Sequence, residues 1–504
     1  MSQISDTRPL KFDDPNDFDR LRDVLARADY TDRGVTELLD VKDARAISGC
    51  DVDILRRRTA GGTPLETLVR LFLVGVSVDV AAARRAVEPM TLEEWTAAGL
   101  LQVQDDAVRA AVQLLPFQGL LIAFDRPQHL QSQRKEDYVM GIGSSTLTLA
   151  NLTVRRPAQA ALDLGTGCGL LAFLAARHSA QVVAVDCNAR AVEMAAFNVR
   201  LNNLPNVDCL AGDLFAPVAG RLFDLIVSNP PFVISPERRY IYRDGGMHGD
   251  GITRRIVSEA PQLLRDDEAG KGGYCQILCN WAHIEGEDWQ QRLAGWFERT
   301  GCDAWVMRTD TLDAPDYALK WIRHTERDDT EGFAERLDEW TAYYRRERIE
   351  AVSGGLITMR RRSGAANWFR ADDGPEKMLG PAGEGIAEGF ELRDFLEDNH
   401  DDNVLLGRRL RISPDARLRQ AFEPSPEGWL PIESQLELSR GLAYSGAVDP
   451  YMAQLIARCD GQHRLGELLV ELARSAGKEP SELAPTLLDV VRRLIERGFL
   501  LPSS

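Results

Sequence analysis

Three alternating glycines at the end of a short apolar run constrain the fold of this chain more than any other feature. The run 160–164 has the length of a strand, and Gly165, Gly167 and Gly169 follow it. From Leu170 onward the pattern becomes that of an apolar helix packed against a sheet. Glycines at a strand-to-helix turn permit positive φ and let a ligand approach the backbone closely. The segment therefore predicts an α/β sheet with a ligand site at this turn.

The following strand-like run, 181–185, ends in Asp186. An acidic residue about 20 positions past a glycine turn, at the tip of the second strand, suits a pair of ribose hydroxyls. A dinucleotide-binding fold uses the same turn and acid, but here the spacing is G-x-G-x-G and the third glycine of G-x-G-x-x-G is missing. Asp163, just before the turn, favours S-adenosylmethionine (SAM), because carboxylates stabilise its cationic amino group and sulfonium. We therefore predict SAM as the cofactor.

A second motif, Asn229-Pro230-Pro231-Phe232, follows another buried-strand run at 223–228. The carboxyl ends of strands are where open α/β sheets bind ligands. Two prolines remove backbone donors and fix φ, so the Asn229 side chain and the Pro230 carbonyl are expected to be rigid. A proline-rich turn that merely ends a strand is the alternative, and the glycine turn upstream argues against it.

Two rigid acceptors suit a planar nitrogen that is about to be methylated. They can hold both hydrogens of an amide or exocyclic amine while its lone pair is turned toward the sulfonium methyl, which is catalysis by orientation. Phe232 is expected to stack on the flat acceptor group. The motif therefore predicts N-methylation.

These two motifs resemble those of the class I SAM-dependent N-methyltransferases of the methyltransferase small domain group. This group includes HemK/PrmC-type release-factor glutamine methyltransferases and RsmC/RlmG-type ribosomal guanine-N2 methyltransferases. The resemblance covers roughly 138–362 and implies a Rossmann-like, seven-stranded α/β core. It also implies that Gly165 and Gly167 line the methionine end of SAM, that Asp186 holds the ribose and that Asp213 lies by the adenine. The predicted cofactor-binding residues are Asp163, Gly165, Thr166, Gly167, Asp186, Cys187, Asp213, Leu214 and Asn229, and the predicted catalytic residues are Asn229, Pro230, Pro231 and Phe232.

The same resemblance leaves two acceptors open. Segment 244–252 looks like the Gly-Gly-x-Asp-Gly-Leu segment of HemK-type enzymes and favours a glutamine side chain of a translation (release) factor. Phe232, where those enzymes usually carry tyrosine, and segment 141–150, which replaces their Arg-Pro-Glu-Thr-Glu type segment, favour RNA. Glutamine is the leading prediction, and a guanine N2 or adenine N6 amine of rRNA or tRNA is the alternative. A non-catalytic SAM-binding regulatory protein is a third interpretation, but it has no need of Asn229-Pro230-Pro231-Phe232.

The charge of the chain favours the protein acceptor. A net charge of -17 and a pI near 5.0 argue against non-specific binding to a phosphate backbone. Segments 343–348, 359–362 and 368–370 interleave arginine with aromatic residues, a pattern that suits phosphates and bases. We favour the simpler interpretation, in which 355–359 is the last strand of the sheet and arginines at its end are solvated.

The chain divides into modules. Residues 1–130 are predicted to be mainly helical, with a helix that starts at Thr63-Pro64 and carries Glu66 as its third residue. Further helices at 80–87 and 91–98, and strand-like runs at 108–115 and 119–124 separated by Pro116, suggest a winged-helix module. Because the third helix is acidic, we expect this module to dock a substrate protein.

The methyltransferase domain is predicted at 131–370, a linker at 371–402, and a mainly helical, winged-helix-like domain at 403–504. The linker is inferred from a composition rich in Gly, Pro, Glu and Asp. No signal peptide and no apolar stretch of about 18 residues stand out, which predicts a cytoplasmic protein with no membrane partner.

Other reactive side chains carry no predicted role. Cys168 and Cys187 are expected to be small packing residues and not nucleophiles. Cys275 and Cys279 are close in sequence but lack a partner set, so no metal site is predicted. His248 is expected to be a loop residue without a function.

Overall fold

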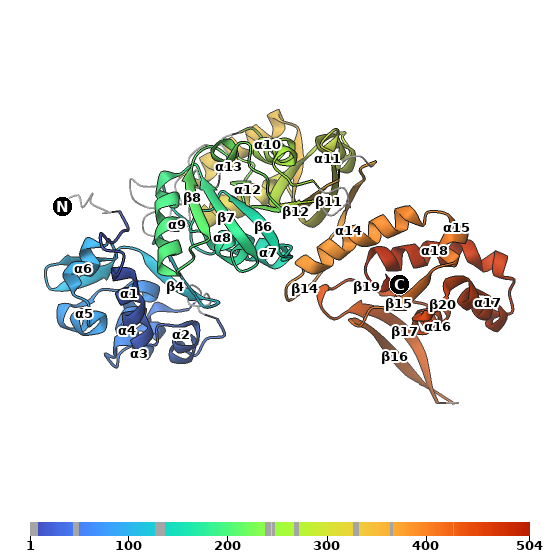
Figure 1. The fold of residues 1–504 in the computed structure, drawn as a ribbon, viewed down its shortest axis with the longest axis horizontal. Coiled ribbons are helices and arrows are strands. Elements are labelled where there is room, and N and C mark those ends of the chain that lie inside the picture. Colours follow the sequence, from blue (N-terminus) through green and yellow to red (C-terminus); the bar gives the residue numbers. More distant parts are fainter. Residues whose placement is uncertain are drawn as a thin grey trace. The chain divides into compact units, whose positions relative to one another are not determined.

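The structure is a computed structural model, and it describes residues 9–43, 50–126, 137–236, 243, 247–266, 272–325, 332–362, 366–426 and 428–503. The chain divides into two compact units (Figure 1). The first comprises Met1–Leu149 and Pro157–Ala371, and the second comprises Ala150–Arg156 and Asp372–Ser504. Both motifs of the predicted site lie in the first unit.

A mixed sheet of eight strands lies at the centre of the first unit, in the order β13-β11-β12-β10-β9-β6-β7-β8. Its strands are β6 (Ala158–Leu164), β7 (Ser179–Asp186), β8 (Val207–Ala211), β9 (Leu225–Ser228), β10 (Tyr274–Ile284), β11 (Cys302–Asp313), β12 (Ile349–Arg361) and β13 (Phe369–Asp373). Strands β6 to β10 are parallel, and β12 is antiparallel to both β10 and β11. Seven strands form the predicted core, and the edge strand β13 is additional. It forms because β11 has a free edge, where the N–H of Ala304 donates to the carbonyl of Trp368 at 2.9 Å.

The strand order reverses between β6 and β9. From β6 the chain continues through β7 and β8 on one side, whereas β9 and β10 lie on the other side. Ligands of open α/β sheets bind in the crevice outside the carboxyl ends of the strands at such a reversal. The loops after β6 and β9 carry the glycine turn and Asn229, so the topology brings the two motifs to one crevice.

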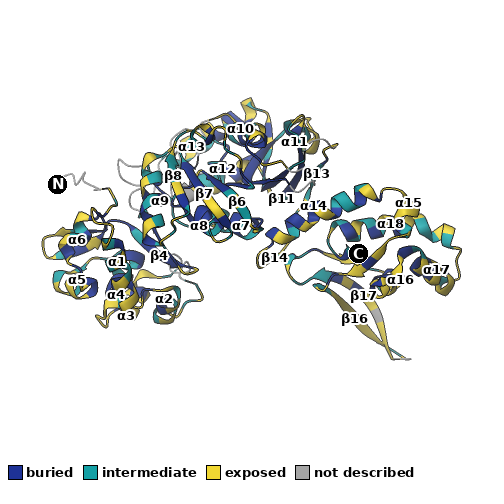
Figure 2. Ribbon diagram, viewed as in Figure 1, coloured by how far each residue is buried: buried dark blue, intermediate teal, exposed yellow. Residues whose placement is uncertain are grey.

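The sheet is covered by helices and buries most of the apolar side chains of the first unit. The helices are α7 (Ser144–Leu152), α8 (Leu170–Ala175), α9 (Ala189–Leu201), α10 (Gly251–Glu259), α11 (Trp289–Phe297), α12 (Ala314–Thr325) and α13 (Phe333–Arg346). Figure 2 shows the buried interior of the sheet, and its core includes Ile226, Ile277 and Trp281. Continuous apolar runs are typical of parallel strands with both faces covered, which is why these strands could be predicted from the sequence.

The N-terminal part of this unit contains the three predicted helices beside a small three-stranded sheet. The order is α4 (Pro64–Val69) with the π-helical turn η2 (Arg70–Val74), β1 (Val78–Asp79), α5 (Val80–Val87), α6 (Leu92–Ala97), β2 (Leu101–Gln104) and β3 (Ala107–Ala110), and the sheet order is β1-β3-β2. Helices α1 (Asp17–Arg27), α2 (Asp32–Leu39) and α3 (Val52–Arg58) precede it. Thr63 and Glu66 form the predicted capping box of α4. The third helix, α6, carries Glu93 and Glu94 in its first turn and is acidic as expected. Glu94 forms an ion pair with Arg20 at 2.6 Å.

The predicted hairpin of this module, formed by strands 108–115 and 119–124, has the wrong bounds. The run 108–115 divides between β3, which pairs with β2, and β4 (Gln113–Phe117), which pairs with β5 (Leu120–Phe124). The side-chain amide of Asn198 bonds both backbone groups of Ala123, and that of Asn202 bonds both groups of Leu121. Two asparagines of α9 thus act like a further strand beside β5. Leu121 is the cross-strand partner of Pro116, and both of its backbone groups bond Asn202 instead of β4, so Pro116 lies inside a strand without losing a hydrogen bond.

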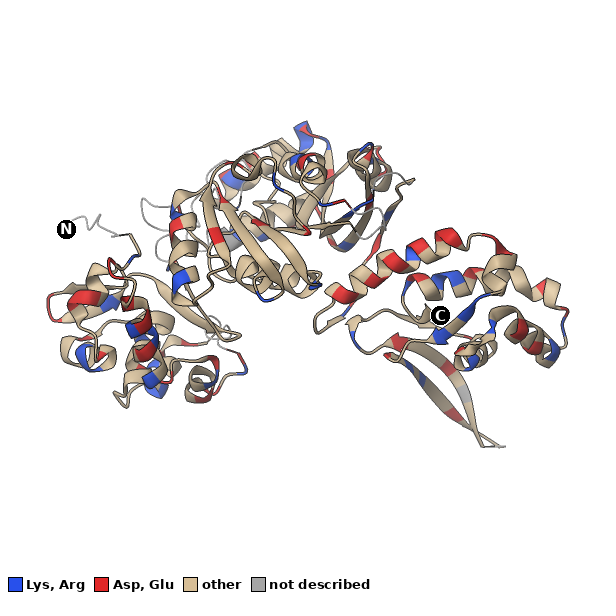
Figure 3. Ribbon diagram, in the orientation of Figure 1, with Lys and Arg blue, Asp and Glu red and all other residues tan. Residues whose placement is uncertain are grey.

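The segment 371–402 is not the structureless linker that its composition predicts. It contains β14 (Met378–Leu379) and the 16-residue helix α14 (Gly383–Asp398). Ile386, Ala387 and Phe390 are fully buried at helical spacing. Figure 3 shows acidic residues along α14, and none of them is buried. The linker prediction is therefore wrong. It relied on composition, and the few apolar residues of α14 are separated by glycines and glutamates that are typical of a linker.

The second unit contains more strand than the predicted helical domain. Its further elements are α15 (Asp402–Leu406), β15 (Arg409–Ile412), β16 (Ala416–Ser425), β17 (Gly428–Leu438), β18 (Gly441–Leu442), β19 (Ser445–Ala447), α16 (Pro450–Arg458), β20 (Asp460–Arg464), α17 (Leu465–Ala476), α18 (Pro480–Glu496) and β21 (Leu500–Pro502). The sequence pattern predicts helices at 451–459, 464–476 and 483–497 and a short apolar strand after them, and these are present as α16, α17, α18 and β21. The prediction missed the hairpin β16–β17, whose apolar residues Phe422 and Trp429 are exposed, so no alternating burial pattern marks it.

Two features are absent from the described ranges. No helix there is long and apolar enough to cross a membrane. No group of three or more His, Cys, Asp and Glu side chains in those ranges is arranged to hold a metal ion.

Candidate active site

The glycine turn after β6 borders a cavity, and its glycines serve two purposes. Gly165, Gly167 and Gly169 have φ values of +77°, +54° and +95°, a region that side chains with a Cβ rarely adopt. A Cβ atom at Gly165 or Gly167 would meet no atom within 4 Å, whereas one at Gly169 would lie 2.2 Å from Cζ of Phe173. The first two glycines thus leave room for a ligand, and the third allows α8 to pack closely on the turn.

Asp186 ends β7 beside the glycine turn, as the sequence predicts. Its Oδ2 accepts a hydrogen bond from the N–H of Gly167 at 2.9 Å, and its Oδ1 accepts one from the N–H of Asn188 at 2.9 Å. Burial raises the pKa of this carboxyl, and the backbone hydrogen bonds oppose the shift. The carboxylate is held in one orientation and has further lone pairs for hydroxyl donors.

A cavity of about 330 Å³ lies at this crevice. Of the predicted cofactor-binding residues, those that line it are Gly165, Thr166, Gly167, Asp186, Cys187, Asp213, Leu214 and Asn229. Tyr138, Met140 and Gly141, just upstream of α7, line it as well and were not predicted. We call this space the cofactor cavity, because its volume, open glycine backbone and fixed carboxylate fit a nucleoside with a charged tail.

Asp163 is not among the residues that line the cofactor cavity, contrary to its predicted place near the cationic groups of SAM. Its side chain is fully buried. Its Oδ2 accepts hydrogen bonds from Oγ1 of Thr166 at 2.6 Å and from the N–H of Ala172 at 3.0 Å. Burial raises the pKa of Asp163 to about 7, although these hydrogen bonds lower it. Asp163 therefore fastens the turn to α8 and supports the cavity indirectly.

The raised pKa of Asp163 makes stability depend on pH. The folded state binds this proton more tightly than the unfolded chain, so the free energy of unfolding falls as pH rises from about 4 to about 7 and is then constant. Asp163→Asn should remove this dependence. Between pH 5 and pH 8 we expect the wild type to lose about 2–3 kcal/mol relative to the variant. Urea unfolding at the two pH values measures the difference, and the same pH dependence in both proteins would contradict it.

Asp186→Ala should weaken SAM binding about 10- to 100-fold, because charge-assisted hydrogen bonds contribute about 1.5–3 kcal/mol each. Titration calorimetry with SAM measures the dissociation constant. Asp208→Ala is a matched control, since Asp208 is an exposed residue of the neighbouring strand β8. Equal affinity of the two variants would remove Asp186 from the cofactor site.

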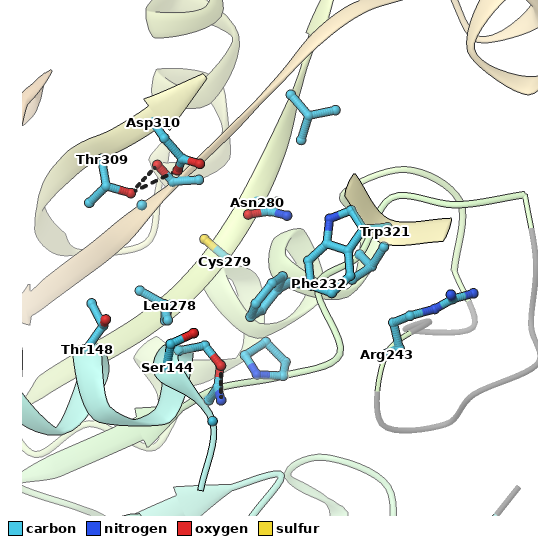
Figure 4. A pocket seen from close by; sticks show the side chains of 18 of the residues that line it. Ser144, Thr148, Phe232, Arg243, Leu278, Cys279, Asn280, Thr309, Asp310 and Trp321 are labelled. Atoms are coloured by element: carbon cyan, nitrogen blue, oxygen red, sulfur yellow. Dashed lines mark hydrogen bonds between the residues drawn. The ribbon is translucent and has the colours of Figure 1, made fainter. Parts of the chain in front are cut away.

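A second cavity, of about 600 Å³, shares Met140, Asn229 and Pro230 with the cofactor cavity. We call it the acceptor cavity. Phe232 and Trp321 lie together on its wall, with ring centroids 6.3 Å apart (Figure 4). Pro231 lines only the cofactor cavity, and Phe232 only the acceptor cavity. The four predicted catalytic residues therefore stand where the two cavities meet.

Charged and polar groups also line the acceptor cavity. Arg243, Asp310 and Lys320 supply the charges, and Nζ of Lys320 lies 3.6 Å from Oδ2 of Asp310. Asn280 and Thr309 add hydrogen-bonding groups, and Figure 4 shows both with Asp310 in the cavity. The cavity can therefore recognise a flat, polar group as well as contact it with aromatic rings.

Asn229 has one end of its amide satisfied and the other free. Its Nδ2 donates to Oγ of Ser145 at 3.2 Å and to Oγ1 of Thr146 at 3.1 Å. Its Oδ1 is buried and accepts no hydrogen bond from the protein. A buried acceptor without a partner costs about 1–3 kcal/mol, so it marks a place where a ligand donor would bind.

The loop after Phe232 is tied to the helices between β11 and β12. Oη of Tyr317 on α12 accepts from the N–H of Ile234 at 3.2 Å and from Nδ2 of Asn280 at 2.7 Å. Oη of Tyr344 on α13 donates to the carbonyl of Ile234 at 2.8 Å. Sequence reasoning missed Tyr317 because it belongs to no local motif, and only the topology brings it to this loop.

The arginine-aromatic segments are not an open stacking surface. Tyr343, Tyr344 and Trp368 are buried, so they cannot receive bases as the RNA interpretation requires. The favoured interpretation is also wrong in one respect, because Arg360 of β12 is 2% exposed and not solvated. Arg345 and Arg346, at the end of α13, are exposed.

The remaining predicted positions differ in how near they lie to the two cavities, and Cys279 lines the acceptor cavity. His248 is exposed and lines neither cavity. Cys275 and Cys279 are both buried on β10, and burial raises the pKa of each thiol well above its ordinary value. In the glycine-rich segment 244–252, residues 244–246 lie outside the described ranges, and Ile252 lines the cofactor cavity.

A doubly wound sheet with an open glycine turn, a ribose-type carboxylate and Asn229-Pro230-Pro231-Phe232 at its switch point defines a class I methyltransferase domain. Comparison with known families agrees. Residues 139–277 match the family described as methyltransferase small domain. Residues 27–111 and 387–502 match two families described only as domains of unknown function, DUF7059 and DUF7782.

Several relatives share this central segment. The chain is 43% identical over 129 residues to a ribosomal protein uL3 glutamine methyltransferase of Bradyrhizobium diazoefficiens, covering 22% of this chain and 40% of that protein. It is 36% identical over 163 residues to a release factor glutamine methyltransferase of Geobacter sulfurreducens, covering 30% and 53%. It is 38% identical over 119 residues to a ribosomal RNA small subunit methyltransferase C of Alcanivorax borkumensis, covering 24% and 31%. The chain thus spans between about a third and about half of the length of these relatives.

Proposed function

We propose that the protein is a SAM-dependent N-methyltransferase that acts on a planar amide or amine nitrogen. The observation that carries this proposal is the buried Oδ1 of Asn229, which has no protein partner and stands between the two cavities. An acceptor N–H would satisfy it. The rings of Pro230 and Pro231 restrict the backbone here, so the carbonyl of Pro230 is held rigidly and is suited to accept the second N–H.

The residues of the cofactor cavity fit SAM. Gly165 and Gly167 leave open space for its methionine end, and the carboxylate of Asp186 suits the ribose hydroxyls. When bound, SAM supplies an electrophilic methyl group on a sulfonium. Asn229 and Pro230 would hold the acceptor hydrogens and thereby aim the nitrogen lone pair, and the proton displaced from that nitrogen would leave to solvent.

The proposed acceptor is a glutamine side chain of a translation factor. Support comes from the relatives named as glutamine methyltransferases of a ribosomal protein and of a release factor. The third helix of the N-terminal module, α6, offers no basic side chain to a phosphate backbone, which is consistent with docking a protein.

One observation favours a second candidate, a nucleobase amine of rRNA or tRNA. The acceptor cavity combines Phe232 and Trp321 with the cations of Lys320 and Arg243. Aromatic side chains and cations are what recognise a base splayed out of its stack with its phosphates. The relative named as a ribosomal RNA methyltransferase is consistent with this candidate.

Transfer of labelled methyl from SAM into an extract of cells that lack the gene tests the proposal. Label that protease removes and ribonuclease leaves would support the glutamine acceptor. Label that ribonuclease removes and protease leaves would establish the nucleobase acceptor. Binding of SAM without any transfer would support the regulatory interpretation and refute the enzyme.

A further inference from the structure

We infer that Ser145 and Thr146 are positioning residues that orient Asn229 for methyl transfer, an inference that rests on the proposed function. Both belong to the first turn of α7, more than 80 positions before Asn229 in the sequence. Their hydroxyls accept the two N–H hydrogens of Asn229, at 3.2 Å and 3.1 Å. The nitrogen end of the amide is therefore fully used.

The orientation of the Asn229 side-chain amide decides whether its oxygen can accept a hydrogen bond from the acceptor nitrogen. An amide presents a donor at one end and an acceptor at the other. With Nδ2 held by two hydroxyls, Oδ1 is the end left without a partner. If the amide turned by half a rotation, its NH2 group would meet the N–H groups of the acceptor and no hydrogen bond would form. In the structure Ser145 and Thr146 hold the productive orientation before any acceptor binds.

The first turn of α7 lies at the boundary between the two cavities. Ser145 lines the acceptor cavity, Thr146 lines the cofactor cavity, and Asn229 lines both. The methyl group has to cross between these cavities. Two hydroxyls from one helical turn thus hold the asparagine at the boundary, and neither residue belongs to the Asn229-Pro230-Pro231-Phe232 motif.

The test is the double variant Ser145→Ala/Thr146→Val, which removes both hydroxyls with little change in volume. We expect the rate of label transfer at saturating acceptor to fall about 10- to 100-fold, the cost of a misplaced catalytic group. The dissociation constant of SAM should change by no more than about threefold, since Asp186 and the glycine turn are untouched. The hydroxyl-retaining variant Ser145→Thr/Thr146→Ser should recover most of the rate.

A matched control is Ser258→Ala/Thr36→Val. These hydroxyls donate to carbonyls of their own helices, at 2.9 Å and 2.8 Å, and lie outside both cavities. This control should keep the wild-type rate. A crystal structure of Ser145→Ala/Thr146→Val with S-adenosylhomocysteine should show the Asn229 amide turned or in two orientations.

The outcomes separate the inference from the proposed function. A wild-type protein that binds SAM but labels neither protein nor RNA refutes the proposed function and the inference with it. An active wild type with an equally active Ser145→Ala/Thr146→Val variant refutes the inference alone. Failure of Ser145→Thr/Thr146→Ser to recover the rate would also overturn it, because the hydroxyls would then act through packing.

Discussion

Asn229→Ala should abolish methyl transfer while leaving SAM binding nearly intact. The variant removes the buried Oδ1 that is placed to hold the acceptor nitrogen, and it leaves the glycine turn and Asp186 in place. Loss of an oriented group of this kind costs about 10²–10³ in rate, and loss of the attack geometry adds to it. We therefore expect a fall of at least about 10³-fold in the rate of label transfer. Calorimetry should give a dissociation constant for SAM within about threefold of the wild type.

The matched control for this variant is Asn403→Ala. Asn403 is an exposed asparagine of α15 in the second unit, and its loss should change neither transfer nor binding. Transfer that persists in Asn229→Ala would show that the acceptor is held by other groups, and the mechanism would be wrong. A large loss of SAM affinity would instead place Asn229 in the cofactor site alone.

The cofactor side of the site could be predicted because it follows from local sequence. The glycine turn, Asp186 and Asn229 each stand directly after a buried strand, and parallel strands end at one edge of a sheet. The error at Asp163 has a physical cause. Position along the strand places a residue near the turn, but the pleat sends alternate side chains to opposite faces, and Asp163 points into the protein.

The acceptor side could not be predicted in the same way. Tyr317, Lys320 and Trp321 come from α12, which lies beyond the segment 139–277 that the family shares. No local pattern distinguishes these residues from an ordinary amphipathic helix. Ser145 and Thr146 belong to segment 141–150, which differs from the corresponding HemK-type segment and carries no recognisable motif of its own. Their contact with Asn229 depends on the tertiary fold, which brings the first turn of α7 to the residue after β9, and sequence spacing does not reveal it.

The arginines at the end of β12 are a further case in which the sequence alone could not predict the environment of a side chain. A run of three arginines at 360–362 indicates a solvated strand end by composition. In the structure Arg360 is 2% exposed and its Nη2 lies 2.6 Å from Oδ2 of Asp303, its cross-strand partner in β11. Arg362 lies 3.0 Å from the same oxygen. The N–H of Trp368 donates to Oδ1 of Asp303 at 3.3 Å, so one buried carboxylate of β11 joins β12 and the residue that precedes the edge strand β13.

Arg360→Met should therefore destabilise the protein by about 3–5 kcal/mol, because it leaves the carboxylate of Asp303 buried with less compensation. Methionine keeps much of the volume, so the loss reports charge and not a cavity. Urea unfolding followed by tryptophan fluorescence measures the change. The control Arg33→Met breaks an ion pair with Glu37 that is largely exposed and should cost less than about 1 kcal/mol. Similar losses in the two variants would mean that the Asp303 carboxylate is not the junction that holds β13 to the sheet.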